Sequence, residues 1–260
     1  MFNRFGRRRL GGVLAIATLW GVGELRAQTL ETETARIVPR HGIKFGYNFE
    51  HQRSAEGQET AMPFIVEFGF DGKTELVVEP IPYTAIRPKV GPRATGPGDV
   101  EVTLVRLVTT ETRSRPAFAI AGEVKIPTAR NVLIGTGKAD FAAYLIGSKR
   151  FGRLDAHLNL GYTFVGQPAG IRLSNIANVA AGFMYDLGGR TRMFGEVLAN
   201  TAATAGAPEG SATPEVAGGE VVGTIGVGRL IAHRLFTTMA ISYDNNGAVL
   251  VRPGFMLTIK

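Results

Sequence analysis

The sequence predicts an all-β fold, a transmembrane antiparallel up-and-down β-barrel of about 12 strands that follows an export signal. Three observations predict it. Apolar side chains recur with a period of two, most expected strands have 10–12 residues, and long connections alternate with short ones. A tilted strand needs about 9–11 residues to cross a bilayer, whereas strands of soluble proteins commonly have about 5–6.

The first 27 residues read as a secretory signal peptide. Arg7–Arg9 give a basic start, Leu10–Val22 is an apolar stretch of 13 residues, and Gly23–Ala27 suits a cleavage region. Such a stretch is too short to span a bilayer as a helix, although an uncleaved anchor helix is the alternative. We therefore expect Sec export to the outer membrane of a Gram-negative bacterium. The expected parts are a signal peptide over 1–27, a periplasmic segment over 28–41 and a barrel over 42–260.

The strands follow in order from the alternation. In 43–50, for example, Ile43, Phe45 and Tyr47 alternate with Lys44 and other small or polar residues. A strand places every second side chain on one face, whereas a helix would scatter them around its axis. The same period predicts strands at 42–52, 61–70, 74–87, 99–109, 116–126, 139–150, 153–164, 176–187, 191–200, 219–229, 234–243 and 248–259.

The connections between these strands have lengths of 8, 3, 11, 6, 12, 2, 11, 3, 18, 4 and 4 residues. Outer-membrane barrels have short periplasmic turns and longer external loops, and an even strand number places both termini in the periplasm. The short connections carry turn residues, as in Asp71-Gly72-Lys73. The long connections, which we expect to gate the lumen from outside, are 88–98, 127–138, 165–175 and 201–218.

Composition excludes several classes of protein. The absence of cysteine excludes a disulfide scaffold, a cysteine-ligated metal and a thiol nucleophile. The first 27 residues hold five arginines and one acid, so they carry +4 of the formal charge of +7, and the remainder is too weakly basic for a nucleic-acid binder. Histidine spacings such as HxxxH are absent. We expect no cofactor, no metal and no nucleic-acid partner.

The alternation places one set of charged and polar side chains on the inner face. Among them, Asp155, His157 and Asn159 share one face of one strand, but that strand supplies no serine as a nucleophile. We interpret the three as a polar ladder in the lumen, and we expect no enzyme activity. The lumen-lining candidates are Lys44, Glu50, Glu67, Glu79, Glu101, Glu123, Lys125, Asp155, His157, Asn159, Asp186, Glu196 and Arg252.

The region from about 98 to 166 resembles a family of bacterial outer-membrane transporters named after the meta pathway of phenol degradation. The similar stretches are Gly98-Asp99-Val100-Glu101, Lys125-Ile126-Pro127-Thr128, Gly135-Thr136-Gly137 with Asp140, Ser148-Lys149-Arg150-Phe151-Gly152 and the stretch from His157 to Phe164. The resemblance implies an outer-membrane barrel that moves aromatic or other small organic compounds, and it supplies no binding residue. The last strand, with Arg252, Gly254, Leu257 and Ile259, resembles the signal that the barrel-assembly machinery reads.

The predicted function is a passive channel or transporter for small organic solutes, with a mild preference for cationic or neutral ones. The alternatives are an outer-membrane enzyme acting on lipid A or phospholipid, and a plugged barrel for surface interactions. A soluble β-sandwich or lipocalin-like barrel is the alternative fold. Expected partners are outer-membrane lipid and lipopolysaccharide, the assembly machinery and a small solute. The basic residues that lipopolysaccharide phosphates would meet are Arg53, Lys89, Arg93, Arg130, Lys138 and Arg172.

Overall fold

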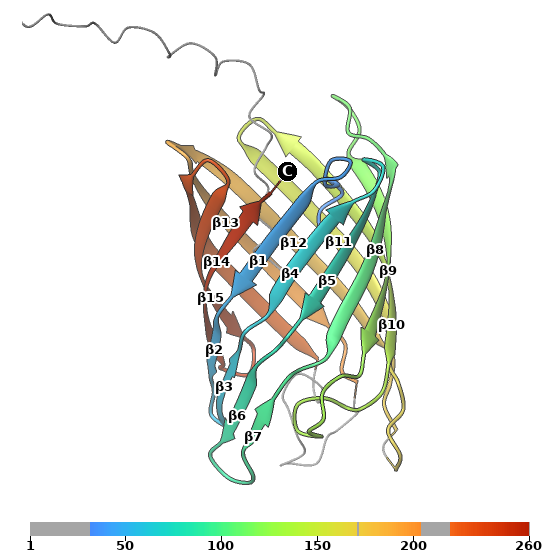
Figure 1. Ribbon diagram of the computed structural model, residues 1–260, viewed down its shortest axis with the longest axis vertical. Coiled ribbons are helices and arrows are strands. Elements are labelled where there is room, and N and C mark those ends of the chain that lie inside the picture. The colour runs from blue at the N-terminus through green and yellow to red at the C-terminus, as the bar shows by residue number, and fades with distance from the viewer. Residues whose placement is uncertain (1–31, 171, 204–218, 260) are drawn as a thin grey trace, which may run out of the picture.

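The computed structural model describes residues 32–170, 172–203 and 219–259. The predicted signal peptide and most of the expected loop 201–218 therefore lie outside the described residues. Tilted strands form one closed wall (Figure 1). The described part of the chain contains no helix that is long and apolar enough to cross a membrane.

Sixteen strand segments make one antiparallel sheet, which closes because β1 pairs with β16. The segments are β1 (Ile43–Asn48), β2 (Glu50–Arg53), β3 (Gly57–Ala61), β4 (Phe64–Gly69), β5 (Thr74–Pro80), β6 (Thr84–Pro88), β7 (Ala94–Gly96), β8 (Val100–Thr109), β9 (Ala117–Ile126), β10 (Asp140–Phe151), β11 (Leu154–Phe164), β12 (Ile176–Gly188), β13 (Thr191–Asn200), β14 (Glu220–Ala232), β15 (Leu235–Asp244) and β16 (Val249–Thr258). Each of the pairs β1/β2, β3/β4, β5/β6 and β7/β8 continues as one wall strand, so the wall has twelve strands, as the sequence predicts.

The four interrupted strands are neighbours in the wall, and their breaks adjoin one another. Pro63, Pro82 and Pro97 lie in three of the breaks, and Phe49 lies in the fourth. Proline has no backbone N–H to donate to the ladder, so it ends regular pairing locally. Single hydrogen bonds still cross the breaks, as where Asn48 N–H donates to the Pro63 carbonyl over 3.0 Å.

Two of the predicted loops are wrong in extent. The connection expected over 53–60 is a turn of residues 54–56, because Gly57–Ala61 pairs with β2 and β6. The connection expected over 88–98 contains β7, which pairs with β6. These short segments are mostly polar, and their backbone partners rather than an apolar period make them strands. The later strands, from β9 onward, match the predicted bounds within three residues.

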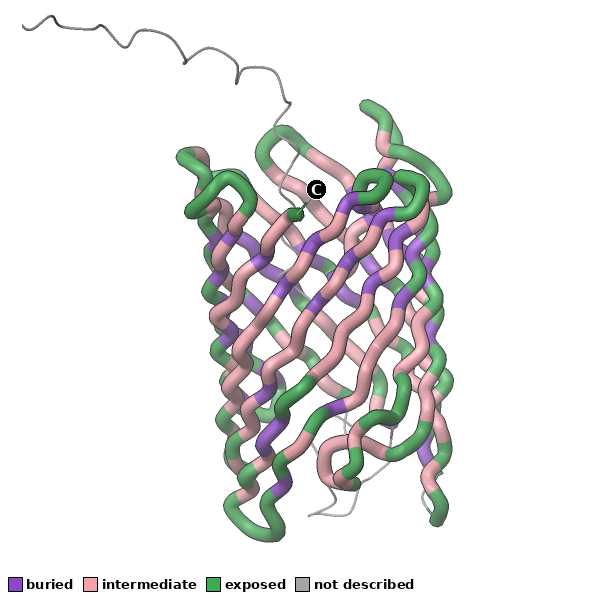
Figure 2. Tube along the Cα trace, viewed as in Figure 1, coloured by how far each residue is buried: buried purple, intermediate pink, exposed green. Residues whose placement is uncertain are grey.

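The barrel has two distinguishable ends. The turn end carries the connections 70–73, 110–116, 152–153, 189–190 and 233–234, and the loop end carries 54–56, 89–93, 127–139 and 245–248. Buried and exposed positions alternate along many strands (Figure 2). The exposed positions hold large apolar side chains such as Phe118, Ile120, Leu145, Leu158 and Ile225.

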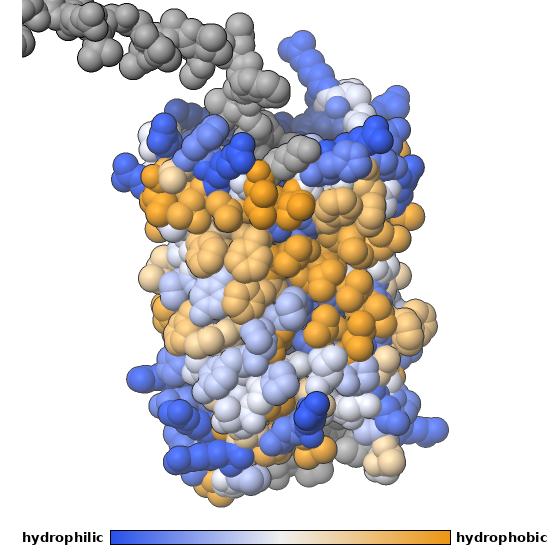
Figure 3. Space-filling model, in the orientation of Figure 1, coloured by the Kyte–Doolittle hydropathy of each residue, from blue (hydrophilic) through white to orange (hydrophobic). Residues whose placement is uncertain are grey.

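On the face shown in Figure 3, apolar residues form a belt between polar residues at the two ends of the barrel. In water such a belt would be a large exposed hydrophobic patch, whereas lipid solvates it. Closure of the sheet gives every wall strand a partner on both sides, which the hydrocarbon core of a membrane requires. The fold is therefore the all-β transmembrane barrel that the alternation predicts.

Candidate functional site

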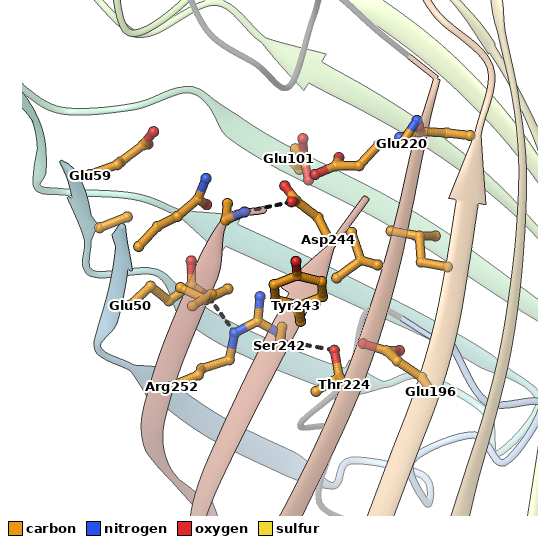
Figure 4. Close-up of a pocket in the computed structure, with 17 residues that line it drawn as sticks. Glu50, Glu59, Glu101, Glu196, Glu220, Thr224, Ser242, Tyr243, Asp244 and Arg252 are labelled. Atoms are coloured by element: carbon orange, nitrogen blue, oxygen red, sulfur yellow. Dashed lines mark hydrogen bonds and ion pairs between the residues drawn. The ribbon is translucent and has the colours of Figure 1, made fainter. Parts of the chain in front are cut away.

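An acidic cavity of about 450 Å³ lies inside the loop-end half of the barrel. Side chains from β2, β3, β8 and β13–β16 line it (Figure 4). Its charged lining consists of six carboxylates and one guanidinium, from Glu50, Glu59, Glu101, Glu196, Glu220, Asp244 and Arg252. We call this cavity the vestibule. Apolar side chains such as Leu198, Val222 and Leu250 lie between the charges.

Several of the lining side chains are held in place by their neighbours. Arg252 Nε lies 2.8 Å from Glu50 Oε1, and the hydroxyls of Thr224 and Ser242 are 2.9 Å apart. The Asp244 carboxylate accepts the Ala248 N–H at 2.7 Å and so closes the adjoining hairpin. The lining holds six carboxylates and one guanidinium, so negative groups are in clear excess in the vestibule.

Glu196 joins the vestibule to the segment that precedes the first strand. Glu196 is 5% exposed, and its Oε2 accepts the Thr32 N–H at 2.9 Å and the Thr32 hydroxyl at 2.7 Å. The sequence predicts a periplasmic segment over 28–41, but the described residues from Thr32 to Val38 lie inside the barrel. We call Thr32–Val38 the lumen segment.

Lumen side chains hold the lumen segment mainly by its backbone. Ser148 Oγ accepts the Ala35 N–H at 2.9 Å, and the Glu75 carboxylate accepts the Val38 N–H. The side-chain amide of Asn159, with its NH₂ turned toward the Glu33 carbonyl, donates to that carbonyl at 2.9 Å and accepts the Glu33 N–H at 2.8 Å. The wall thus satisfies four N–H groups and one carbonyl of the segment, and the Arg36 N–H donates to Thr34 Oγ1 within the segment.

Arg36 is the charged contact of the lumen segment. Its Nη2 lies 2.5 Å from Asp155 Oδ1 and 2.8 Å from Glu111 Oε2. Burial by itself would raise the pKa of Glu111, but the Arg150 N–H and the Arg36 guanidinium outweigh burial and hold this pKa below the ordinary range of glutamate. Glu111 is therefore ionised at neutral pH and available to Arg36.

Apolar packing adds to the contacts between the lumen segment and the wall. Ala35 belongs to a buried cluster inside the barrel, and Ile37 packs against the same cluster. The wall members of the cluster are Ile65, Val77, Val105, Ala117, Ala119, Ala121 and Ile146. The lumen therefore has an open acidic half at the loop end and a filled half at the turn end.

The predicted lumen candidates separate into three groups. Glu50, Glu101, Glu196 and Arg252 line the vestibule. A second group forms pairs along the wall. Lys44 contacts Glu67, and the Glu123 carboxylate accepts a hydrogen bond from the Tyr144 hydroxyl at 3.3 Å. Lys125 contacts Asp140 and lies 3.8 Å from Asp99. Two candidates lie elsewhere. Glu79 stands opposite Glu101 in the β5–β8 register, and Asp186, near the turn end, accepts the Gly188 N–H at 2.8 Å.

The third group, Asp155, His157 and Asn159, faces the lumen segment rather than open space. Its neighbour Ser148, on β10, is a residue that sequence reasoning missed. Ser148 Oγ lies 2.9 Å from His157 Nδ1, and Asp155 Oδ1 lies 4.0 Å from His157 Nε2. The pair resembles part of a hydrolase triad, but Ser148 is 1% exposed and its Oγ already accepts the Ala35 N–H. The contacts therefore make Ser148 an anchor for the segment.

Other residues of the site also escaped the sequence reasoning. Glu59, Glu220 and Asp244 line the vestibule. Inward parity within the strand predicted over 219–229 could have found Glu220, whereas Asp244 lies one residue beyond the strand predicted over 234–243. Arg36 and Glu111 lie outside every predicted strand, so no alternation marks them. Within the described residues, no three histidine, aspartate or glutamate side chains form a group that could hold a metal ion.

Comparison with known proteins identifies the fold of this chain but not its family. No family model matches the chain, and no curated protein matches it. The COG4313 outer membrane channel from Pseudomonas putida F1 superposes with a TM-score of 0.70 at 9% identity, over 88% of this chain and 100% of that one. The KdgM porin, solved in complex with oligogalacturonate, superposes with a TM-score of 0.57 at 10% identity, over 84% of this chain and 99% of that one.

This chain has the barrel fold of outer-membrane channels. At such low identity the likeness establishes architecture alone. The resemblance of 98–166 to the phenol-degradation transporter family stays a prediction.

Proposed function

We propose that this protein is an outer-membrane channel through which small neutral and cationic organic solutes diffuse. The observation that carries the proposal is the vestibule, where six carboxylates face one guanidinium in a cavity of about 450 Å³. A cavity lined by one sign of charge concentrates counter-ions and repels co-ions. The size suits a small organic molecule, and the apolar side chains between the acids suit its hydrocarbon part.

The charge of the vestibule makes it unsuited to the ligand with which the KdgM porin is solved. That porin is solved with oligogalacturonate, a polyanion. A lining of six carboxylates would repel such a ligand, so we place this chain among channels for cationic and neutral solutes. The protein would reside in the outer membrane, with lipid around its apolar belt and the loop end facing outward.

The direct test is ion selectivity in planar bilayers under a potassium chloride gradient. We expect the wild-type current to prefer potassium over chloride. The triple variant E59Q/E101Q/E220Q should reduce the permeability ratio at least threefold, because three vestibule charges are removed without a change of shape. The effect should weaken from 0.1 M to 1 M salt, since the screening length falls from about 10 Å to about 3 Å.

The matched control is E56Q, because Glu56 is an exposed acid in the hairpin between β2 and β3, outside the vestibule lining. It should leave the permeability ratio unchanged. A channel function is contradicted if correctly folded protein yields neither current in bilayers nor solute flux into liposomes. An unchanged permeability ratio in the triple variant would instead show that the vestibule carboxylates do not set the ion selectivity.

A further inference from the structure

We propose that the lumen segment Thr32–Val38 is a gate, which closes the turn end while Arg36 is bound and opens it on release. The inference rests on the proposed channel function, since a gate needs a path to close. The position of the segment is the first reason. It runs from Glu196, at the boundary of the vestibule, to Glu75, beside the turn end, and so lies along the filled half of the lumen.

The anchors on the wall would keep partners after the segment leaves. Lys149 Nζ lies 3.4 Å from Glu111 Oε1, and Arg150 Nη2 lies 2.9 Å from Asp155 Oδ2. Ser148 likewise keeps His157 at 2.9 Å. Removing one partner of a buried ion pair is strongly unfavourable when it strands the other charge. Here both carboxylates retain a cation, so release of Arg36 strands neither.

The segment also has a fixed pivot. His41 adopts a left-handed backbone with φ of 58°, and its N–H donates to the Gly69 carbonyl at 2.7 Å. The Gly42 N–H donates to the Pro39 carbonyl at 2.8 Å, which makes a tight turn at the start of β1. The turn stays bound to the wall through Gly69, so the chain before it can move without unfolding the first strand.

Arg36 is the contact whose loss should release the segment. Its guanidinium bridges two carboxylates of the wall, Asp155 on β11 and Glu111 in the connection between β8 and β9. The other anchors described for the segment are hydrogen bonds of backbone N–H groups and of the Thr32 hydroxyl to carboxylates, to Ser148 or to the Asn159 amide, and none of them pairs two opposite charges. The variant R36A therefore removes the strongest contact and leaves the wall intact.

The experiment uses the natural absence of cysteine, so introduced thiols are the sole reactive ones. Thr34 Oγ1 lies 3.4 Å from Ser148 Oγ, which places two near-isosteric cysteines within reach of a disulfide. Three variants follow from this contact. T34C reports accessibility to a membrane-impermeant maleimide, T34C/R36A reports accessibility after release, and T34C/S148C locks the segment when oxidised.

We expect T34C/R36A to be labelled at least tenfold faster than T34C. The conductance of R36A should exceed that of the wild type at least threefold. The oxidised T34C/S148C variant should lose its current, and dithiothreitol should restore the current. The matched control is R106A, because Arg106 also pairs with an acid, Asp71 at 2.7 Å, but on the exposed surface. It should leave both readouts at the wild-type level.

The outcomes separate the gate from the channel. Heat-modifiable gel migration establishes that each variant is a folded barrel. If the variants conduct but neither R36A nor the oxidised lock changes the current, the gate is overturned and the channel stands. If no variant conducts, although fast labelling shows that the segment has left, both the channel and the gate are overturned. Labelling of T34C/R36A as slow as that of T34C overturns Arg36 as the contact that holds the segment.

Discussion

Replacing Lys44 by alanine should destabilise the barrel by about 3–5 kcal/mol, because it strands a buried carboxylate. Lys44 Nζ contacts Glu67 Oε2 inside the wall, and Glu67 is 1% exposed. The other oxygen, Glu67 Oε1, meets no hydrogen-bond donor among the described residues. Without the lysine, the buried carboxylate loses its counter-charge. Guanidinium unfolding of the barrel in lipid vesicles measures the loss.

The double variant K44M/E67L is the control for this prediction. Replacing a whole buried ion pair by apolar residues of similar volume is often neutral or stabilising, so the double variant should be close to the wild type in stability. The two single variants and the double variant form a thermodynamic cycle that isolates the pair. A loss below about 1 kcal/mol in K44A would contradict the assignment of Glu67 as a charged group that depends on Lys44.

The variant G226A should destabilise the barrel by about 1–3 kcal/mol through overpacking. Gly226 lies on the inner face of β14, where a Cβ would lie 2.3 Å from Cζ of Phe194 and 2.8 Å from the Met239 carbonyl oxygen. The Phe194 ring is fully buried at 0% exposure, so it has little space to move away. The backbone must shift or the ring must leave its rotamer, and either response loses packing.

Gly223 supplies the matched control on the same strand. A Cβ at Gly223 would meet nothing within 4 Å, so G223A should change the free energy of unfolding by no more than about 0.5 kcal/mol. The two alanine variants share intrinsic strand preference, and their difference isolates the contact with Phe194. Equal stabilities in urea or guanidinium would show that the ring over Gly226 does not limit packing there.

Much of the wall was predictable from the sequence because side-chain alternation is a local property. The strand expected over 191–200 has those bounds in the structure, and the fold class and the twelve wall strands agree as well. The polar segment Gly57–Ala61 escaped prediction because only its partners β2 and β6 make it a strand. The prolines at three of the four breaks were visible, but the alignment of the breaks across neighbouring strands depends on register.

The sequence predicted which side chains face the lumen, but it did not predict which of them lie together. Parity places Glu101, Glu196 and Arg252 on the inner face, yet it cannot say that they share one vestibule. Ser148 and His157 illustrate the reason. They are nine residues apart and become neighbours because β10 and β11 pair in a particular register. Sequence distance along one strand does not contain that information.

By itself, the sequence determined a wall of alternating strands that need a partner on both edges and lipid on one face. Those properties follow from the side-chain period and from the need to satisfy backbone hydrogen bonds in a membrane. Only the tertiary structure decided that Thr32–Val38 lies inside the barrel, bound by Glu196, Ser148 and Asp155. The physical reason is that this short segment has no side-chain alternation of its own, so its conformation depends on the wall groups that form hydrogen bonds with it. Those wall groups come together only when the barrel closes.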